Sequence, residues 1–123
     1  MKKLEDLSDG RILYKSHRAE PYFSFIKNGV KNIEGRVLKN LYKDLKPEDE
    51  ILIFNNEETD NFRVRVGDIV NYSFFKEMLE KEDYKKVLPD IDSAEEGIEI
   101  YRKFYTEKQE IGFGVIAIKI ELI

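Results

Sequence analysis

Residues 29–36 read Gly-Val-Lys-Asn-Ile-Glu-Gly-Arg, and this stretch decides the fold because it joins a predicted helix to a predicted strand. Gly29 supplies the positive backbone φ that a tight turn out of a helix needs. Residues 32–38 have the pattern of a half-buried strand, in which Ile33, Gly35 and Val37 alternate with Glu34 and Arg36. The stretch therefore predicts a sharp change from helix to strand.

The polar residues of this stretch are expected to gather on one side of the strand. Glu34 and Arg36 are two positions apart, so their side chains point to the same face, which Asn32 shares. Lys31 sits at the junction, where strand alternation need not hold. Gly35 has no side chain, so a flat ligand can approach the backbone there.

Two interpretations of this cluster are open. Arg36 suits bidentate recognition of a phosphate or a carboxylate, and a desolvated Lys31 suits a general base as well as a phosphate contact. In the alternative, Lys31, Glu34 and Arg36 form an ion-pair network on an exposed strand face.

Outward from this stretch, the sequence predicts one short helix before it and several strands after it. Pro21 opens the helix at its first position. Residues 51–54 form a buried strand, and residues 62–66 form a strand of alternating apolar and basic residues. Gly67 predicts a bulge or a corner before the strand residues 69–72.

The C-terminal half predicts two helices and a closing strand. The first helix begins near Phe75 and ends between Tyr84 and Leu88, before the helix-breaking Pro89. The second begins with a capping-box sequence at residues 93–96. The closing strand places its isoleucines on one face.

The coarse order of elements is β-α-β-β-β-α-α-β, in which strands and helices do not alternate regularly. A parallel doubly wound sheet is therefore disfavoured. We expect an α+β fold with a small, strongly curved, mixed or antiparallel sheet. It would form a partial barrel whose openings are covered by helices.

Composition indicates one globular domain over residues 1–123, with residues 1–10 as a polar lead-in. The chain has no cysteine, which excludes disulfides and thiolate chemistry. His17 is the only histidine, so paired-histidine sites are excluded, and we expect no metal and no cofactor. The sequence shows no signal peptide and no window of ~18 apolar residues. We expect a cytoplasmic protein without a membrane partner.

The charge is distributed unevenly along the chain. The net charge of −4 excludes a general polyanion binder. Residues 1–46, however, hold eleven Lys and Arg against six Asp and Glu, whereas residues 47–123 hold ten against nineteen. The N-terminal part is therefore positive and contains the stretch at 29–36. This division is compatible with a local positive cleft for one nucleotide or a short single strand.

Several residues outside the central stretch are candidates for ligand contact. His17, just before the short helix, either touches a ligand or is simply solvated. Arg63 and Arg65 share one strand face, where they either extend a positive surface towards RNA or form the polar side of an antiparallel strand. Three tyrosines lie nearest to polar segments and are the candidates for stacking on a base: Tyr22, Tyr42 and Tyr72.

The central stretch resembles the hallmark of the ASCH domain family, G-x-K-x-x-E-x-R, which is complete here in Gly29, Lys31, Glu34 and Arg36. The chain is similar to small single-domain prokaryotic members in three further segments, residues 20–23, 74–89 and 114–118. The resemblance covers nearly all of the chain from about Ile12 onward.

This resemblance implies a PUA-like pseudo-barrel of about five to six strands, mixed or antiparallel, with about three helices covering it. It also implies a cleft around the helix–strand junction that binds RNA, a nucleotide or a nucleoside. The expected ligand-binding residues are Gly29, Lys31, Asn32, Glu34, Arg36 and His17.

An enzymatic alternative also comes from the resemblance. A related small bacterial branch hydrolyses the amide of acetylated cytidine nucleosides, and other members have been credited with ribonuclease activity. In an enzyme of either kind, Lys31 and Glu34 would be catalytic. The bacterial branch has a threonine nucleophile at the position of Glu34, and a carboxylate forms the same acyl-enzyme less readily. Its second carboxylate has three candidates here: Glu80, Glu82 and Asp90.

Overall fold

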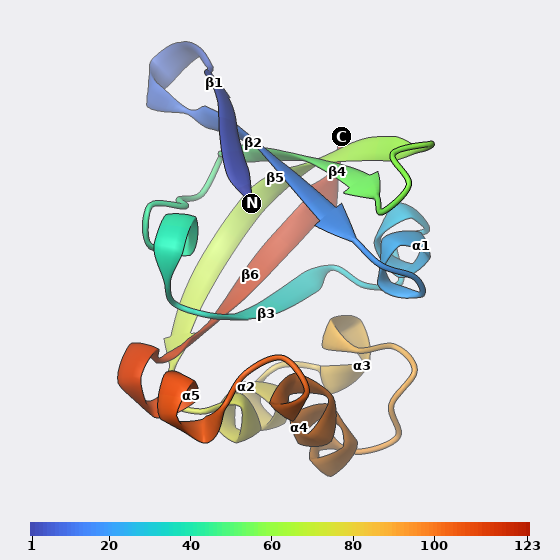
Figure 1. Cartoon of the computed structure of the whole chain (residues 1–123), viewed down its shortest axis with the longest axis vertical. Helices are drawn as coiled ribbons and strands as arrows, with labels where there is room; N and C mark the ends of the chain where they lie inside the picture. Colours follow the sequence, from blue (N-terminus) through green and yellow to red (C-terminus); the bar gives the residue numbers. More distant parts are fainter.

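The computed structural model describes residues 1–123 and shows one curved, open sheet of six strands (Figure 1). The strand order is β1-β2-β4-β5-β6-β3, and every pair is antiparallel except β2 with β4. The strands are β1 (Lys2–Asp6), β2 (Ile12–Arg18), β3 (Ile33–Val37), β4 (Glu50–Asn55), β5 (Asn61–Tyr72) and β6 (Val115–Leu122).

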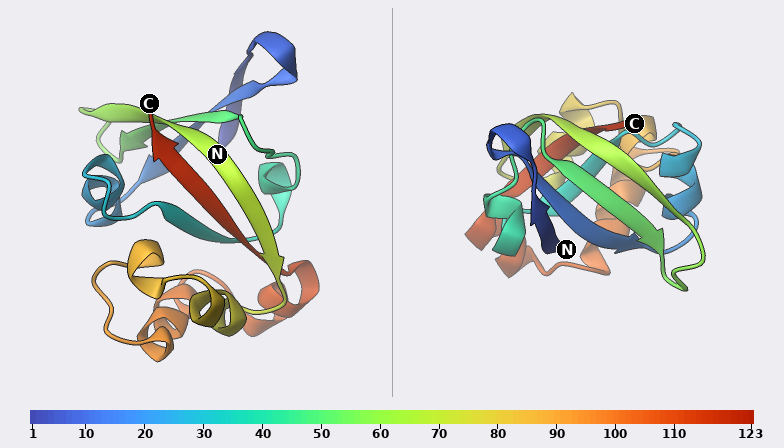
Figure 2. Two further views of the ribbon diagram at one scale, coloured as in Figure 1. Left: turned by 180° about the vertical axis from the view of Figure 1, so that it is seen from behind. Right: turned by 90° about the horizontal axis from the view of Figure 1, so that it is seen from above.

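The helices fall into two groups around this sheet. Helix α1 (Tyr22–Lys27) and the 3₁₀ turn η2 (Asn40–Lys43) flank it on opposite sides, and a second 3₁₀ turn, η1 (Ser8–Gly10), joins β1 to β2. The other helices gather beyond β3, at one end of the molecule (Figures 1 and 2). They are α2 (Phe75–Lys81), α3 (Tyr84–Val87), α4 (Ala94–Arg102) and α5 (Glu107–Phe113). None of the helices has the length and apolar composition that a membrane span needs.

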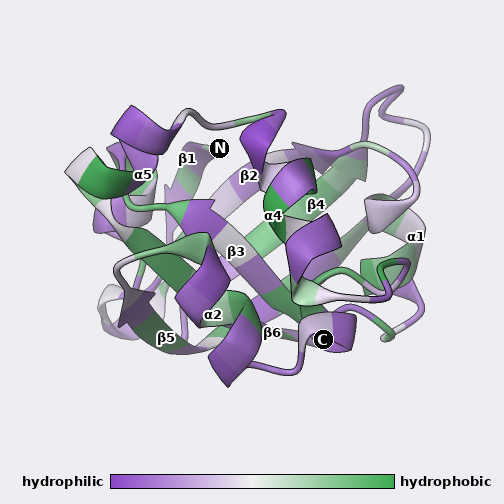
Figure 3. Cartoon of the chain, turned by 90° about the horizontal axis from the view of Figure 1, so that it is seen from below, coloured by the Kyte–Doolittle hydropathy of each residue, from purple (hydrophilic) through white to green (hydrophobic).

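The sheet separates two hydrophobic cores. Strand β6 contributes to both, because its successive side chains point to opposite faces. Ile116 and Ile118 pack inside the curved sheet with residues of β2, β4, β5 and α1. Val115 and Ala117 pack on the other face, against α2, α3 and α4. The helices bury their apolar residues there, and α2 alternates between hydrophilic and hydrophobic residues along its length (Figure 3).

The expected α+β pseudo-barrel is confirmed, as a mixed sheet that stays open. The long strand β5 shows its register shift against β6 between Val66 and Ile69, where Gly67 predicted a bulge. The short helix α1 is confirmed, with Pro21 at its N-cap after a cis Glu20–Pro21 peptide bond rather than at the first helical position.

Five α-helices occur where about three were expected. The helix predicted from Phe75 is divided into α2 and α3, since Asp83 caps a new helix by accepting from the Lys85 amide. Helix α5 has its own capping box, formed by Thr106 and Gln109, and was not predicted. At α4, Ser93 caps the helix as predicted, but the Glu96 carboxylate accepts from Asp92 N instead of closing the box.

One expectation about exposure is corrected by the tertiary structure. Residues 1–10, the predicted polar lead-in, include the fully exposed strand β1, which pairs with β2 and forms the edge of the sheet. Strand β3 was expected to be half-buried, yet Glu34 on its polar face is only 5% exposed. The curvature of the sheet brings β2 across from that face, while the helices cover the other one.

Candidate functional site

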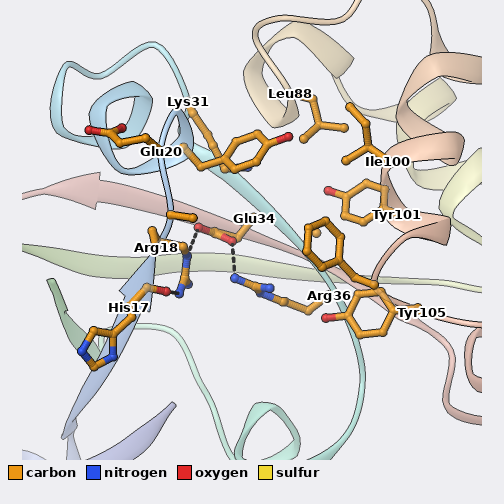
Figure 4. Close-up of a pocket in the computed structure, with 14 residues that line it drawn as sticks. His17, Arg18, Glu20, Lys31, Glu34, Arg36, Leu88, Ile100, Tyr101 and Tyr105 are labelled. Atoms are coloured by element: carbon orange, nitrogen blue, oxygen red, sulfur yellow. Dashed lines mark hydrogen bonds and ion pairs between the residues drawn. The ribbon is translucent and has the colours of Figure 1, made fainter. Parts of the chain in front are cut away.

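A cavity of about 320 Å³ lies between β2, β3 and the residues of α4 and just beyond it (Figure 4). Its volume falls in the range of small-molecule sites. One side carries charged residues from the two strands, and the other carries aromatic and aliphatic residues from the C-terminal helices. The cavity therefore combines a polar floor with an apolar wall.

Glu34 is the centre of the polar floor. Its Oε1 accepts from Arg18 Nε at 2.8 Å, and its Oε2 lies 3.1 Å from a terminal nitrogen of Arg36. Arg18 is itself held in place, since it donates to Ser16 Oγ and to the His17 carbonyl. Strands β2 and β3 are not neighbours in the sheet. The Arg18–Glu34 pair therefore connects them across the opening of the barrel.

The charges around Glu34 set its protonation state. Burial by itself would raise the pKa of Glu34, but Arg18 and Arg36, with Lys31, hold that pKa well below its usual range. The carboxylate is consequently ionised throughout the neutral range. Both of its oxygens are already occupied by guanidinium groups, so Glu34 organises the floor and has no proton to give.

Lys31 closes one end of the floor and is 4% exposed. Its Nζ donates to the carbonyl of Ile33 at 2.7 Å and to the carbonyl of Val87 on α3. Burial lowers the pKa of Lys31 to about 8; Glu34 opposes this shift, and Arg36 and Arg18 add to it. The amine can thus change its charge near physiological pH.

We predict that this shift can be measured as a pH-dependent stability. The pKa of Lys31 is about 8 in the folded chain against an ordinary value of 10.5, so between these values the unfolded chain binds more protons there. The free energy of unfolding therefore rises with pH across this window, by up to about 1.4 kcal/mol per pH unit. Urea unfolding of wild type and Lys31→Met at pH about 8 and about 9.5 measures it. The free energy of unfolding of Lys31→Met should not show this rise. An equal rise in wild type and in Lys31→Met would contradict the lowered pKa of Lys31.

The wall of the cavity is built on a stack of aromatic rings. Tyr101 lies on Phe75 with centroids 4.1 Å apart and planes 8° apart, and the Tyr105 ring is stacked 5.6 Å from the same Phe75. The Tyr101 hydroxyl presses against Gly35 of β3, where an added Cβ would stand 2.4 Å from it. At the rim, Phe104 is 67% exposed. The wall therefore offers a ligand both a tightly packed ring, Tyr101, and an exposed ring, Phe104.

The buried carboxylate of Glu110 helps to hold this stack in place. Glu110 of α5 accepts from the Phe75 amide at 2.6 Å and from Arg102 of α4 at 2.7 Å. Its carboxylate therefore joins α5 to the start of α2 and to the end of α4. These three helices fix the positions of the rings that face β3.

The free polar groups of the floor are donors. Arg36 is about one-quarter exposed, and its Nε is buried without a hydrogen-bond partner. Burial opposes the charge of Arg36, but Glu34 raises its pKa, so the guanidinium stays charged. Since both carboxylate oxygens of Glu34 already bind arginines, the floor presents positive charge and N–H groups to a ligand. It fits a flat ligand that carries hydrogen-bond acceptors.

Four of the six predicted binding residues meet at this cavity: Lys31, Glu34, Arg36 and His17. The other two do not. Gly29 has the expected positive φ of 80°, but with Asn32 it borders a separate hollow near β6. Asn32 precedes β3, and its amide donates to the Lys86 carbonyl, so the strand alternation that was to place it beside Glu34 does not extend to it.

The remaining candidates are distributed over several surfaces. His17 is at the cavity but is exposed and bonded to Glu58 at 2.8 Å. Tyr22 lines the cavity, Tyr42 lies beside Arg36, and Tyr72 instead donates to Glu82. None of the three candidate second carboxylates lines the cavity; the carboxylate that joins Glu34 there is Glu20.

Arg63 and Arg65 are on the polar side of β5, away from the cavity. They pair with Glu50 and Glu48 respectively. This arrangement supports the interpretation of these arginines as the polar side of an antiparallel strand. No group of three or more Asp, Glu or His side chains is placed to hold a metal ion.

Sequence analysis missed Arg18, Tyr101, Tyr105 and Phe104 as cavity residues. Arg18 is the last residue of β2, a strand whose polar and apolar residues alternate too weakly to single it out. Tyr101 lies on α4, and Tyr105 lies three residues beyond its last residue, Arg102. Their spacing of four residues was a usable signal for a shared face, but it could not say what that face meets.

Comparison with known proteins identifies relatives. The family model described as ASCH domain matches residues 17–123. The crystal structure of the hypothetical protein PH0355 superposes with a TM-score of 0.80 at 42% identity, covering 90% of this chain and 99% of that one. The solution structure of protein PF0455 from Pyrococcus furiosus gives 0.74 at 39% identity, covering 90% and 97%. An ASCH domain from Lactobacillus crispatus gives 0.58 at 12% identity, covering 91% and 80%, and shares the fold. No curated protein matches the sequence.

Proposed function

Because the chain belongs to the ASCH domain family, we propose that it is an RNA-binding module that holds one nucleotide in the cavity between β2, β3 and α4. The observation that carries the proposal is the pairing of a donor-rich positive floor with an aromatic wall. Arg36 and Lys31 suit the acceptor atoms of a phosphate or a base edge. The aromatic rings suit the face of the base. Single-stranded RNA is recognised in general by this combination of stacking and edge contacts.

Replacing both Lys31 and Arg36 with alanine is expected to abolish RNA binding at low salt. The change removes two cations and the free donors of the floor. Fluorescence anisotropy or gel shift with a short single-stranded RNA measures the affinity, and circular dichroism verifies the fold. Lys81→Ala/Lys108→Ala removes the same charge from exposed positions on α2 and α5 and serves as the control. An unchanged affinity in the cavity variant would show that RNA binds elsewhere.

The lowered pKa of Lys31 favours a second candidate, hydrolysis of a modified nucleoside. With a pKa of about 8, a fraction of Lys31 is neutral at physiological pH and able to accept a proton as a base. Glu34 is held ionised, so it would stabilise charge and would not act as an acid. Incubation with acetylated cytidine, followed by the ultraviolet change on deacylation, tests this candidate. The absence of turnover at high protein concentration would rule out this hydrolase candidate. Digestion of RNA, with Lys31→Ala as the contamination control, tests a ribonuclease.

A further inference from the structure

A line of basic side chains and aromatic rings leads away from one end of the cavity. Arg36 and Tyr105, which both line the cavity, are its beginning. The Arg36 guanidinium lies 5.6 Å from the centre of the Tyr42 ring, and Lys39 Nζ lies 5.9 Å from the centre of the Tyr105 ring. Further out, Lys43 Nζ lies 5.8 Å from the ring of Phe113. We call Lys39, Tyr42, Lys43 and Phe113 the outer strip.

Two elements that are distant in sequence form this strip. Lys39 follows β3 and caps η2, which contains Tyr42 and Lys43, whereas Phe113 ends α5. The ribbon views agree that η2 and α5 lie on the same side of the molecule, opposite α1 (Figures 1 and 2). Lys31, just before β3, and Arg36, near its end, both line the cavity, and only Leu38 and Lys39 separate β3 from η2. The strip is therefore a continuation of the cavity floor.

The side chains of the outer strip are open to a ligand. Lys43 is exposed, Lys39 is partly exposed, and Phe113 is 44% exposed. Neither of the two lysines takes part in an ion pair, whereas Lys27 and Lys46 each pair with an aspartate. A lysine held near a ring and free of a carboxylate can meet a phosphate without first breaking a salt bridge.

The chemistry of the strip indicates its occupant. Cations spaced along a surface attract a phosphate backbone, and interleaved rings provide stacking platforms for bases of any sequence. The strip belongs largely to the positive N-terminal part of the chain, in which residues 1–46 have a surplus of five basic residues. A free nucleoside would fill the cavity and leave the strip unused.

From these contacts we infer that the ligand is a single-stranded RNA, with one base in the cavity and its neighbouring nucleotides on the outer strip. This inference rests on the proposed function of the cavity and extends it. It specifies a strand over a free nucleoside, and it gives the direction in which the strand leaves the cavity, over η2 and the end of α5.

The test compares a small probe with a long one. The small probes are the four ribonucleoside monophosphates, and the long probe is a fluorescent single-stranded RNA octamer of mixed sequence. Lys39→Ala/Lys43→Ala should weaken octamer binding about tenfold and lower the slope of log affinity against log salt by about 1.4, since each phosphate contact on a single strand contributes ~0.7. Phe113→Ala should weaken it about fivefold or more. Both variants should bind the monophosphates as wild type does.

Lys103→Ala/Lys108→Ala is the matched control, because it removes two exposed positive charges outside the strip. It should leave the octamer salt slope nearly unchanged. If wild type bound the monophosphates as tightly as the octamer, the inference about the outer strip would be overturned, and the cavity proposal would stand. If Lys39→Ala/Lys43→Ala kept the wild-type salt dependence of octamer binding, the inference about the outer strip would be overturned and the cavity proposal would stand. Wild type that binds neither probe would overturn the proposed function itself.

Discussion

Replacing Glu34 with glutamine should lower the free energy of unfolding by about 3–5 kcal/mol at neutral pH, the cost of breaking a buried ion pair by removing one partner. The variant keeps the size of the side chain but leaves Arg18, Arg36 and Lys31 clustered without a counter-charge. Repulsion among the three cations would open the gap between β2 and β3. Urea unfolding followed by circular dichroism measures the loss.

Glu58→Gln is the matched control for this experiment. Glu58 also meets two basic side chains, Lys15 and His17, but it is exposed. Water and salt screen an exposed pair, so its loss should change stability far less. Equal losses for the two variants would contradict the view that Glu34 is the organising charge of the site.

The same substitution has a defined pH dependence. The folded pKa of Glu34 is depressed, so its contribution to stability is fully present above the unfolded pKa of about 4.5 and is lost as pH falls towards the folded value. The difference between wild type and Glu34→Gln should therefore shrink as the pH falls below about 4.5. A difference that persists unchanged at strongly acidic pH would mean that the carboxylate charge is not its source.

Replacing Gly35 with alanine should cost about 3 kcal/mol, the upper end of the range for overpacking a core. The new Cβ would stand 2.4 Å from the Tyr101 hydroxyl oxygen and 2.9 Å from Met78 Cε. Tyr101 cannot easily retreat, because its ring is stacked on the buried Phe75. The substitution should also weaken RNA binding, since any adjustment moves the wall of the cavity.

A double-mutant cycle identifies the cause of this loss. Tyr101→Phe removes the hydroxyl that makes the shortest contact, so Gly35→Ala should cost less in that background than in wild type. Part of the cost remains, because the Tyr101 Cζ position is 3.0 Å from the new Cβ. Gly112→Ala is the control: nothing lies within 4 Å of its added Cβ, and a helical alanine is favoured over glycine. Additive losses in the cycle would rule out the hydroxyl contact as the cause.

Local patterns in the sequence were sufficient for most of the framework. The alternation before and after Gly67 predicted β5 with its bulge, and Ser93 predicted the start of α4. These features depend on neighbours in the chain, which is why a sequence shows them. The division between α2 and α3, and the whole of α5, were missed because their caps are short polar sequences that resemble ordinary loops.

The candidate site was predictable only in part. Lys31, Glu34 and Arg36 are within six residues of one another, and their spacing placed the two charged strand residues on one face. Their partners come from far along the chain: Arg18 lies on another strand, and Tyr101 is more than sixty residues away. No periodicity within the motif contains that information.

By itself, the sequence determined which charged groups project from β3, because the two-residue period of a strand is a local property of the backbone. The tertiary structure alone decided that this face is buried. The sheet curves until β2 opposes β3, and the helices place a stack of aromatic rings beside them. Burial then gives the same residues different properties, since it locks Glu34 between two arginines and lowers the pKa of Lys31 to about 8. The positions of the charged groups follow from the geometry of the chain, whereas their pKa values depend on how far the fold buries them from water.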